Sequence, residues 1–372
     1  MGEPANASDI DRLPLISADS HVEEPDAFFV DNLPASMHAA LCPELRPRTE
    51  IAAEFGKRIG AVRGSDARFE EIARGRTNDP EGRFEVLIED GIQGECIYPS
   101  RSLYVWNLTD PDVGRACCRI YNDWIHDILE SRSPRFRCAG LIPTWRIPDA
   151  LEELERIRGL GLAAAMLPLV GTPDYNLREW EPLWSAIEDS GLPVVMHQGT
   201  GHDMLFYRSR GAAVANLLAT QSMAPRTAGL LATSGVLAEH PGLHFVFVET
   251  NAAWISWAMV TLDHYYDAFR QYEGWVRPVL EEKPGFYIAR QLHGTFQVDP
   301  VAVSNIEHTG VEPLMWGSDF PHGEGTYPNS RSTVRRLFGG LDPEAIAPMV
   351  GGTAARLFDF APEVLAEPVR PR

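Results

Sequence analysis

Eight short apolar segments recur along the chain, separated by stretches with helical periodicity. Several of them, such as LAAAMLPLV at 162–170, are nearly continuous apolar runs, which is typical of strands buried on both faces of a parallel sheet. Eight alternating units predict an α/β fold, a closed (β/α)8 TIM barrel, with an open doubly wound sheet as the alternative. The expected strands cover residues 15–22, 92–100, 137–144, 162–170, 192–199, 243–250, 286–296 and 312–320.

The length of 372 residues suits one such barrel with insertions. We expect an N-terminal extension over 1–14, the barrel over 15–358 and a Pro-rich, extended tail over 359–372. Scattered Pro, Gly and charged residues over 23–90 interrupt the rhythm between the first two strands. This segment is interpreted as an insertion that forms either a lid or pocket wall, or a helical decoration or dimer contact.

The charge balance excludes several classes of partner. The formal net charge is -19, with 52 acidic and 33 basic residues, so a nucleic acid or an anionic membrane would be repelled. The start of the chain lacks the pattern of a signal peptide, and no apolar run is long enough to cross a bilayer. The five cysteines include no CxxC pair, which favours reduced, buried thiols. A cytoplasmic protein that acts on a small molecule is expected.

Four of the expected strands end in side chains that can bind a metal. The first ends in Asp19 and His21, which a strand's two-residue period points the same way, and the fifth delivers His197. Since the carboxyl ends of barrel strands meet at one mouth, these groups and Asp319 of the eighth strand should converge. Two imidazoles and two carboxylates form a mixed N/O set that suits a catalytic zinc, manganese or iron ion with open positions. Glu249 ends the sixth strand.

The sequence resembles the amidohydrolase superfamily, within it the amidohydrolase-related (amidohydrolase 2) branch that includes aminocarboxymuconate semialdehyde decarboxylase and the hydroxybenzoate decarboxylases. The resemblance spans about residues 15–358 and rests on SADSHVEEPDAF (17–28), GIQGECIYPS (91–100), PVVMHQGTG (193–201), EHPGLHFVFVETNAAW (239–254), LMWGSDFPHGEGTYPNS (314–330) and GGTAARLF (351–358). It implies a distorted TIM barrel with one divalent metal, Zn²⁺ or Mn²⁺. Together with the Pro-rich tail it implies a homodimer or higher homo-oligomer.

The resemblance also assigns roles. It implies that Asp19, His21 and His197 ligate the metal, and that Asp319 lies beside it and transfers protons. An acid that can accept the proton of a metal-bound water fits the same role, so Asp319 is the first candidate for general acid and base. His322, three residues later, is expected to orient Asp319 or the substrate.

The chain departs from its relatives at two strand ends. Many of them begin with HxH or ExH, where this chain has Asp19, and the related decarboxylases place a histidine at the end of the sixth strand, where this chain has Glu249. Glu249 is therefore a candidate for assisting proton transfer or binding substrate. The only lysines, Lys57 and Lys283, lie away from the strand ends, which excludes a carboxylated lysine and predicts a mononuclear site.

Four further residues are candidates for substrate contact. Glu24 follows His21 by three residues, His202 and Arg208 lie in the loop after the fifth strand, and His293 lies on the seventh. For each of the last three an ordinary loop or core role is an open alternative.

Two activities fit the same residues. The first hypothesis is a metal-dependent hydrolase, in which Asp319 activates a metal-bound water that attacks a small, carboxylated or aromatic substrate. The alternative is a non-oxidative decarboxylase of an aromatic or enoic acid, in which Asp319 delivers a proton to carbon. Glu249 tilts the sequence interpretation toward hydrolysis. A scaffold that binds metal without catalysis is a third hypothesis.

Overall fold

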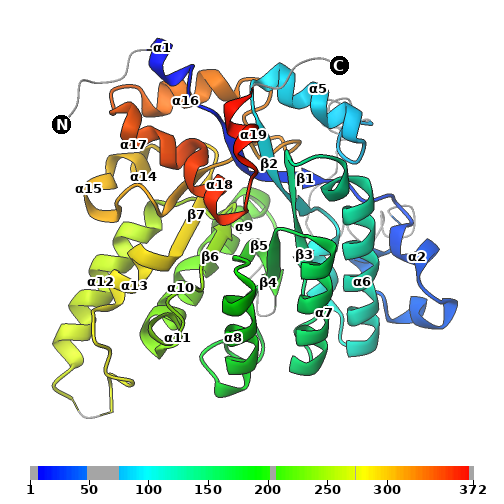
Figure 1. Cartoon of the computed structure of the whole chain (residues 1–372). Coiled ribbons are helices and arrows are strands. Elements are labelled where there is room, and N and C mark those ends of the chain that lie inside the picture. The colour runs from blue at the N-terminus through cyan, green and yellow to red at the C-terminus, as the bar shows by residue number, and fades with distance from the viewer. Residues whose placement is uncertain (1–6, 48–74, 202–206, 273, 368–372) are drawn as a thin grey trace.

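The eight strands form one parallel sheet in sequential order, which is the topology of a (β/α)8 barrel. The computed structural model describes residues 7–47, 75–201, 207–272 and 274–367. Figure 1 shows the strands at the centre with the long helices along the outside. The strands are β1 Ile16–Val22, β2 Gly94–Pro99, β3 Phe136–Leu141, β4 Ala164–Val170, β5 Val194–Gly201, β6 Phe245–Val248, β7 Leu292–Phe296 and β8 Leu314–Trp316.

The outer layer consists mainly of helices that connect successive strands. The longer ones are α5 Pro80–Asp90, α6 Pro111–Ile128, α7 Ile147–Leu160, α8 Glu181–Ser190, α9 Ala212–Gln221, α10 Met223–Ser234, α12 Ala253–Phe269, α13 Pro284–Gln291 and α16 Ser330–Phe338. Short helices are α1 Ala7–Ile10, α2 Phe28–Asn32, α11 Val236–Glu239, α14 Pro300–Ser304, α15 Ile306–Thr309, α17 Pro343–Ala347, α18 Thr353–Leu357 and α19 Pro362–Ala366. The 3-10 helices are η1 Ala35–Ala40, η2 Pro43–Leu45, η3 Ser102–Asn107, η4 Glu130–Arg132 and η5 Arg178–Trp180, and η6 Pro348–Gly352 is a short π-helix.

Local sequence explains where helices begin and end. The Asp110 carboxylate accepts hydrogen bonds from the first backbone N–H groups of α6, and Pro111 follows it at the first helical position, where no N–H is needed. Helices α7 and α8 end at Gly161 and Gly191, both in the left-handed conformation that glycine adopts at little cost. These signals fix the lengths of the helices that span from one strand to the next.

The core lies inside the strands and between strands and helices. All residues of β1, β2, β4, β6, β7 and β8 are buried, as the apolar runs predicted. At about 25 cal/mol for each Å² of buried apolar surface, this two-sided burial is the main stabilising contribution to the barrel. Among the described residues, no helix is both long enough and apolar enough to span a membrane.

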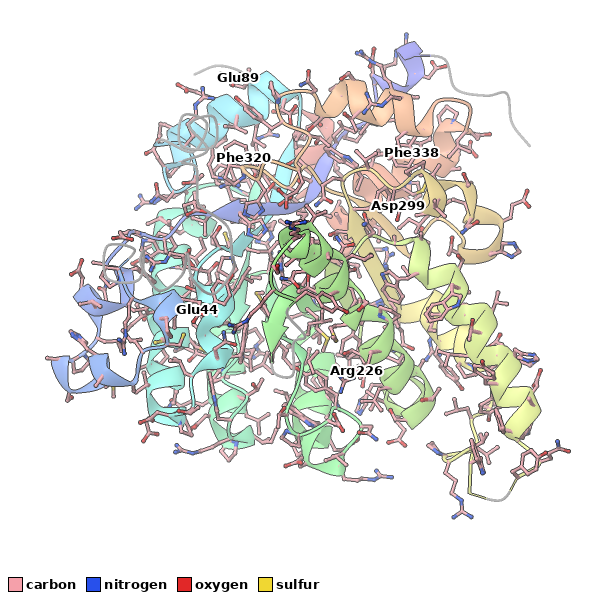
Figure 2. The ribbon with its side chains drawn as sticks, turned by 180° about the vertical axis from the view of Figure 1, so that it is seen from behind. Glu44, Glu89, Arg226, Asp299, Phe320 and Phe338 are labelled. Atoms are coloured by element: carbon pink, nitrogen blue, oxygen red, sulfur yellow. The ribbon has the colours of Figure 1, made fainter. Side chains whose placement is uncertain are left out.

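The barrel closes where β8 meets β1. Ser20 and Phe320 form a parallel bridge, and the N–H of His21 donates to the carbonyl oxygen of Phe320 at 2.6 Å. Phe320 is labelled in Figure 2, beside the strand β1. The Asp319 N–H donates to the Asp19 carbonyl at 2.8 Å. These few bonds are the seam of the barrel, and they involve the residues singled out as metal ligands.

The structure corrects the expected seventh strand. Residues 286–291 of the predicted strand 286–296 belong to α13, and only Leu292–Phe296 are extended. Pro284 occupies the first turn of this helix, and Tyr287, Ile288 and Gln291 are buried on one face, at the spacing of an amphipathic helix. The short apolar run at 286–288 therefore packs as a helical face, a case in which a short run does not distinguish helix from strand.

The segment between β1 and β2 contains described structure at both ends. Helix α5 precedes β2 as the other helices precede their strands, and the buried Arg83 donates to the carbonyl of His21 at 2.7 Å. Residues 48–74 lie outside the described residues, so a lid, pocket wall or dimer contact over 23–90 stays a prediction. The tail, expected to be extended, includes the short helix α19, whose Val364 is buried.

Candidate metal centre

Five acidic and histidine side chains from four strand ends meet in the barrel mouth. Asp19 and His21 come from β1 and His197 from β5, while Glu249 and Asp319 follow β6 and β8. All five are buried, with exposed fractions from 0% for Asp19, His21 and Asp319 to 6% for Glu249. The convergence expected from the sequence is therefore present.

The candidate ligand atoms lie close to the distances that one shared ion would impose. Measured from His21 Nε2, candidate donor atoms lie at 3.1 Å for His197 Nε2, 3.6 Å for Asp19 Oδ1 and Asp319 Oδ1, and 3.8 Å for Glu249 Oε2. Ligands at about 2.1 Å from a single ion are separated by roughly 3.0 Å in an octahedron and 3.4 Å in a tetrahedron. Small movements would bring these atoms around one divalent ion.

Both histidines turn the same nitrogen toward the cluster. His21 Nδ1 lies 2.9 Å from the carbonyl of Pro99, and His197 Nδ1 lies 2.8 Å from the carbonyl of Gln198. A carbonyl only accepts, so each Nδ1 carries the hydrogen and each Nε2 faces the other ring. Two nitrogen lone pairs at 3.1 Å repel each other unless a cation, a proton or a metal, lies beside them. The arrangement therefore suits two imidazoles that share one metal ion.

Two carboxylate oxygens of the cluster are also unsatisfied. Within the described ranges, no group donates a hydrogen bond to Asp19 Oδ1 or Asp319 Oδ2, although both atoms are buried. The other oxygen of Asp19 accepts from Thr295 and Gln297, each at 3.2 Å. A buried carboxylate oxygen without a donor is costly, and a cation removes that cost. The residues present therefore fit a divalent metal held by Asp19, His21, His197 and Asp319.

The backbone is strained where two of the acids leave their strands. Glu249 and Asp319 have φ of 58° and 55°, in the left-handed region that residues other than glycine seldom adopt. Such conformations cost of order 1–3 kcal/mol each and cluster at functional sites. Before Asp319, Gly317 lets β8 approach β1, since a Cβ at this position would lie 2.4 Å from the Cβ of Asp19.

The crowding of acids shifts their proton affinities. Burial raises the pKa of Asp19 well above its usual range, and the nearby charge of Asp319 adds to this. Burial and the charge of Glu249 raise the pKa of Asp319 to about 7. Burial and neighbouring histidines lower the pKa of His21, which favours the neutral ring that a metal requires. Excess negative charge in a dry site is the setting in which a cation is attracted most strongly.

His322 contacts Asp319 directly. Its Nδ1 lies 2.7 Å from Asp319 Oδ1, and its side chain is 23% exposed, unlike the other members of the cluster. Burial alone would lower the pKa of His322, but the charge of Asp319 and this hydrogen bond raise it to about 10. His322 therefore connects the buried acid with the outer part of the mouth, consistent with the expectation that it orients Asp319.

Two of the four candidates for substrate contact, Glu24 and His293, bind elsewhere than in the cluster. Glu24 uses both carboxylate oxygens to accept the backbone N–H groups of Arg101 and Ser102, which holds η3. His293 lies near the start of β7, where its ring contacts the Glu312 carbonyl at 2.9 Å and His244 at 3.1 Å, so it is a core residue.

The other two belong to the loop after β5. Arg208 is exposed, and His202 lies outside the described residues.

Sequence reasoning missed the polar residues that hold the ligands. Gln198 donates to Glu249, and Thr220 donates to Gln198 at 3.0 Å. Thr295 donates to Asp19 Oδ2 and accepts the Glu249 N–H at 2.8 Å. Thr295 lies near the end of β7, so the search for polar residues at strand ends that found Glu249 would have found it too. Nothing local in the sequence marks Thr220.

Comparisons with known proteins agree with this architecture. The sequence profile described as Amidohydrolase matches residues 34–360. A search of curated proteins found no match. Among solved structures, 5-carboxyvanillate decarboxylase from Sphingomonas paucimobilis is 20% identical, with a TM-score of 0.69 over 94% of this chain and 100% of its own.

Two further structures contain manganese. A dihydroxybenzoic acid decarboxylase from Polaromonas sp. JS666, with bound manganese and the inhibitor 2-nitroresorcinol, is 16% identical, with a TM-score of 0.67 over 95% of this chain and 100% of its own. A 5-carboxyvanillate decarboxylase from Novosphingobium aromaticivorans, complexed with manganese and 4-hydroxy-3-methoxy-5-nitrobenzoic acid, is 16% identical, with a TM-score of 0.72 over 94% of this chain and 97% of its own. At these identities the similarity shows a shared fold.

Proposed function

The chain belongs to the amidohydrolase family, and from this premise we propose that it is a non-oxidative decarboxylase of a small aromatic or enoic carboxylic acid that uses one divalent metal. The resemblance seen in the sequence is thereby confirmed at the level of the family. The hydrolase hypothesis that the sequence favoured is unconfirmed, and the decarboxylase alternative has more support. That support is the similarity, over nearly the whole chain, to several decarboxylases of hydroxylated benzoic acids.

The observation that carries the proposal is the pair of oxygens on Asp319. Oδ1, which lies 3.6 Å from His21 Nε2, is held by His322 at 2.7 Å, while Oδ2 is buried without a donor among the described residues. A carboxyl group fixed at one oxygen and open at the other is placed to hold a proton and release it to a substrate atom beside it. Its burial keeps bulk water from taking that proton first.

In this scheme the residues of the chain act as follows. A divalent ion, when bound, would supply a positive charge that attracts a carboxylate and an adjacent hydroxyl of the substrate. Asp19, His21 and His197 hold that charge in a fixed position. Asp319 delivers its proton from Oδ2 to the carbon that bears the carboxylate. The bond to the carboxylate then breaks, its electron pair stays with the substrate carbon, and carbon dioxide leaves. His322, which is bonded to Oδ1 and reaches the more exposed side, keeps Asp319 oriented while a proton from water restores the carboxyl group.

Hydrolysis remains the second candidate because of one residue. Glu249 places a second carboxylate 3.2 Å from His197 Nε2. The family resemblance implies a histidine at this strand end in the related decarboxylases. Two acids at one site can share the removal and return of protons that hydrolysis of an ester, amide or lactone needs. The same ligands serve both reactions, so the distinction depends on the fate of the substrate's atoms.

The experiment is to incubate the metal-loaded protein in oxygen-18 water with a panel of hydroxylated aromatic acids, enoic acids, esters and lactones, and to analyse products by mass spectrometry. Release of carbon dioxide without uptake of heavy oxygen would support the decarboxylase. Heavy oxygen in a cleaved product would overturn it in favour of the hydrolase. Binding of metal without turnover of any substrate class would favour the third hypothesis, a non-catalytic scaffold.

Three further expectations stay proposals. Zn²⁺ and Mn²⁺ both suit two histidines and two carboxylates, and metal analysis of the purified protein would distinguish them. We also propose a homodimer or higher homo-oligomer, and light scattering coupled to size-exclusion chromatography would measure its molar mass. A cytoplasmic location is tested by cell fractionation.

A further inference from the structure

We infer that Glu249 is itself a ligand of the metal, a fifth donor on the same ion. This inference rests on the metal centre proposed above. Its Oε2 lies 3.2 Å from His197 Nε2 and 3.8 Å from His21 Nε2. The spacing matches that of the Asp19 and Asp319 oxygens from His21, both at 3.6 Å. With its side chain only 8% exposed, Glu249 belongs to the wall of the site.

The two oxygens of Glu249 have different surroundings. Oε1 accepts a hydrogen bond from the Gln198 side-chain amide, and the oxygen of that amide accepts from the Thr220 hydroxyl at 3.0 Å. These two hydrogen bonds, which connect Thr220 on α9 and Gln198 on β5 to Glu249, turn the carboxylate so that Oε2 faces the two histidine nitrogens. Partner groups of this kind orient carboxylate ligands in metal sites. Gln198 and Thr220 are therefore positioning residues for Glu249.

The backbone of Glu249 is fixed to the same site. Its N–H donates to the Thr295 hydroxyl oxygen at 2.8 Å, and that hydroxyl donates to Asp19 Oδ2 at 3.2 Å. One β7 side chain thus sets the positions of two acids at once. The left-handed backbone of Glu249 repeats that of Asp319, so both acids enter the mouth through the same unusual conformation. A strained conformation that is held on every side is typical of a functional position.

A fifth donor changes the chemistry of the site. The site would then contain two neutral imidazoles and the three carboxylates of Asp19, Glu249 and Asp319. If all three carboxylates are ionised, the net charge of the site with a divalent ion is about -1. Oxygen-rich sets suit Mn²⁺ better than they suit softer ions, which prefer nitrogen and sulfur. We therefore expect Glu249 to favour Mn²⁺ over Zn²⁺, relative to a site with only Asp19, His21, His197 and Asp319.

The experiment measures metal binding on the full chain, without any substrate. The protein is stripped with a chelator, and Mn²⁺ is titrated while free ion is followed by electron paramagnetic resonance. Glu249→Gln keeps the size and removes the charge, and Glu249→Asp keeps the charge but withdraws the carboxylate by one methylene. Glu324→Gln, at an exposed acid in the loop after β8, is the matched control for loss of a nearby negative charge.

If Glu249 is a ligand, both Glu249 variants bind Mn²⁺ at least about 10-fold more weakly, since loss of a supporting residue alone costs 10- to 100-fold. The spectrum of the bound ion changes as well, and Glu324→Gln stays within about 2-fold of the parent protein. Aspartate tolerates the left-handed backbone, so Glu249→Asp should fold even if Glu249→Gln does not. Thermal melts of the metal-free proteins check this.

Two outcomes overturn the inference. If Glu249→Asp is folded and binds Mn²⁺ with the affinity and spectrum of the parent protein, Glu249 acts on substrate and not on metal. If Glu249→Gln and Glu324→Gln weaken Mn²⁺ binding equally while Glu249→Asp does not, Glu249 affects the ion only through its negative charge and is not a ligand. A parent chain that binds no Mn²⁺ or Zn²⁺ would instead refute the metal centre on which the proposed function depends.

Discussion

The backbone N–H of Asp319 donates a hydrogen bond to the carbonyl oxygen of Asp19 at 2.8 Å, and the two side chains both enter the metal centre. The seam that closes the barrel and the proposed metal site therefore share residues. An ion shared by Asp19 and Asp319 would hold β1 and β8 together. Several consequences of this relationship can be measured.

Metal should stabilise the whole fold. An ion that binds only the folded chain adds RT ln(1 + [L]/Kd), about 2.7 kcal/mol at a concentration 100 times Kd. We expect the melting temperature to rise on addition of Mn²⁺ and to fall after chelation. Because the ligands bridge the seam, hydrogen exchange of the β1 and β8 amides should slow the most. An equal effect on all strands would contradict a role for the ion at the seam.

Replacing His197 should remove the metal. In His197→Ala the ion loses one of two imidazoles, and we expect most bound metal to be lost on dialysis, as measured by inductively coupled plasma mass spectrometry. His126→Ala, at a half-buried histidine on α6 outside the cluster, is the control and should retain the ion. Full occupancy in His197→Ala would refute its assignment as a ligand.

Asp319→Asn should separate folding from turnover. The amide keeps the shape of the side chain but cannot hold and release the proton, so we expect turnover to fall by at least about 100-fold, the usual contribution of a general acid. The circular dichroism spectrum should be unchanged. Asp189→Asn, at an exposed acid ending α8, serves as the control for the substitution itself. An active Asp319→Asn enzyme would remove Asp319 from proton transfer.

Glu130 should make stability depend on pH outside the metal site. Burial raises the pKa of its carboxyl to about 7, despite the nearby charge of Arg137 and the Cys138 N–H that donates to it at 2.5 Å. In the unfolded chain the pKa is about 4.3. Between these values the folded state holds the extra proton, so this contribution is complete at low pH and is lost as pH rises toward 7.

We therefore expect Glu130→Gln to change the slope of unfolding free energy against pH, by at most about 1.4 kcal/mol per pH unit between pH 5 and 7. Urea unfolding at pH 5, 6 and 7 measures this slope. Glu155→Gln, whose carboxylate is largely exposed, is the control and should leave the slope unchanged. Parallel profiles for Glu130→Gln and the parent would show that Glu130 is ionised across this range.

Strand order and the meeting of the candidate ligands at one mouth could be predicted because both depend on local patterns. Buried parallel strands are continuous apolar runs, and a metal-capable residue at the end of such a run, as at His197 or Asp319, must lie at the mouth. The predicted seventh strand wrongly included residues of α13, because the apolar run at 286–288 is too short for its spacing to distinguish a helix from a strand. Thr220 and Gln198 could not be linked from sequence, since their contact depends on how α9 packs on β5.

The barrel can close only after the ribosome has synthesised both β1 and β8. Ser17 and Ser318 meet across the seam although they are 301 positions apart in the chain. At about 5–20 residues per second, a ribosome needs roughly 15–60 s to make the chain between them. During that interval β1 has emerged without its partner on one edge, with Asp19 and His21 lacking the acid that completes their site. The proposed site is therefore complete only after its last strand has left the ribosome, and we expect the ion to bind after that point.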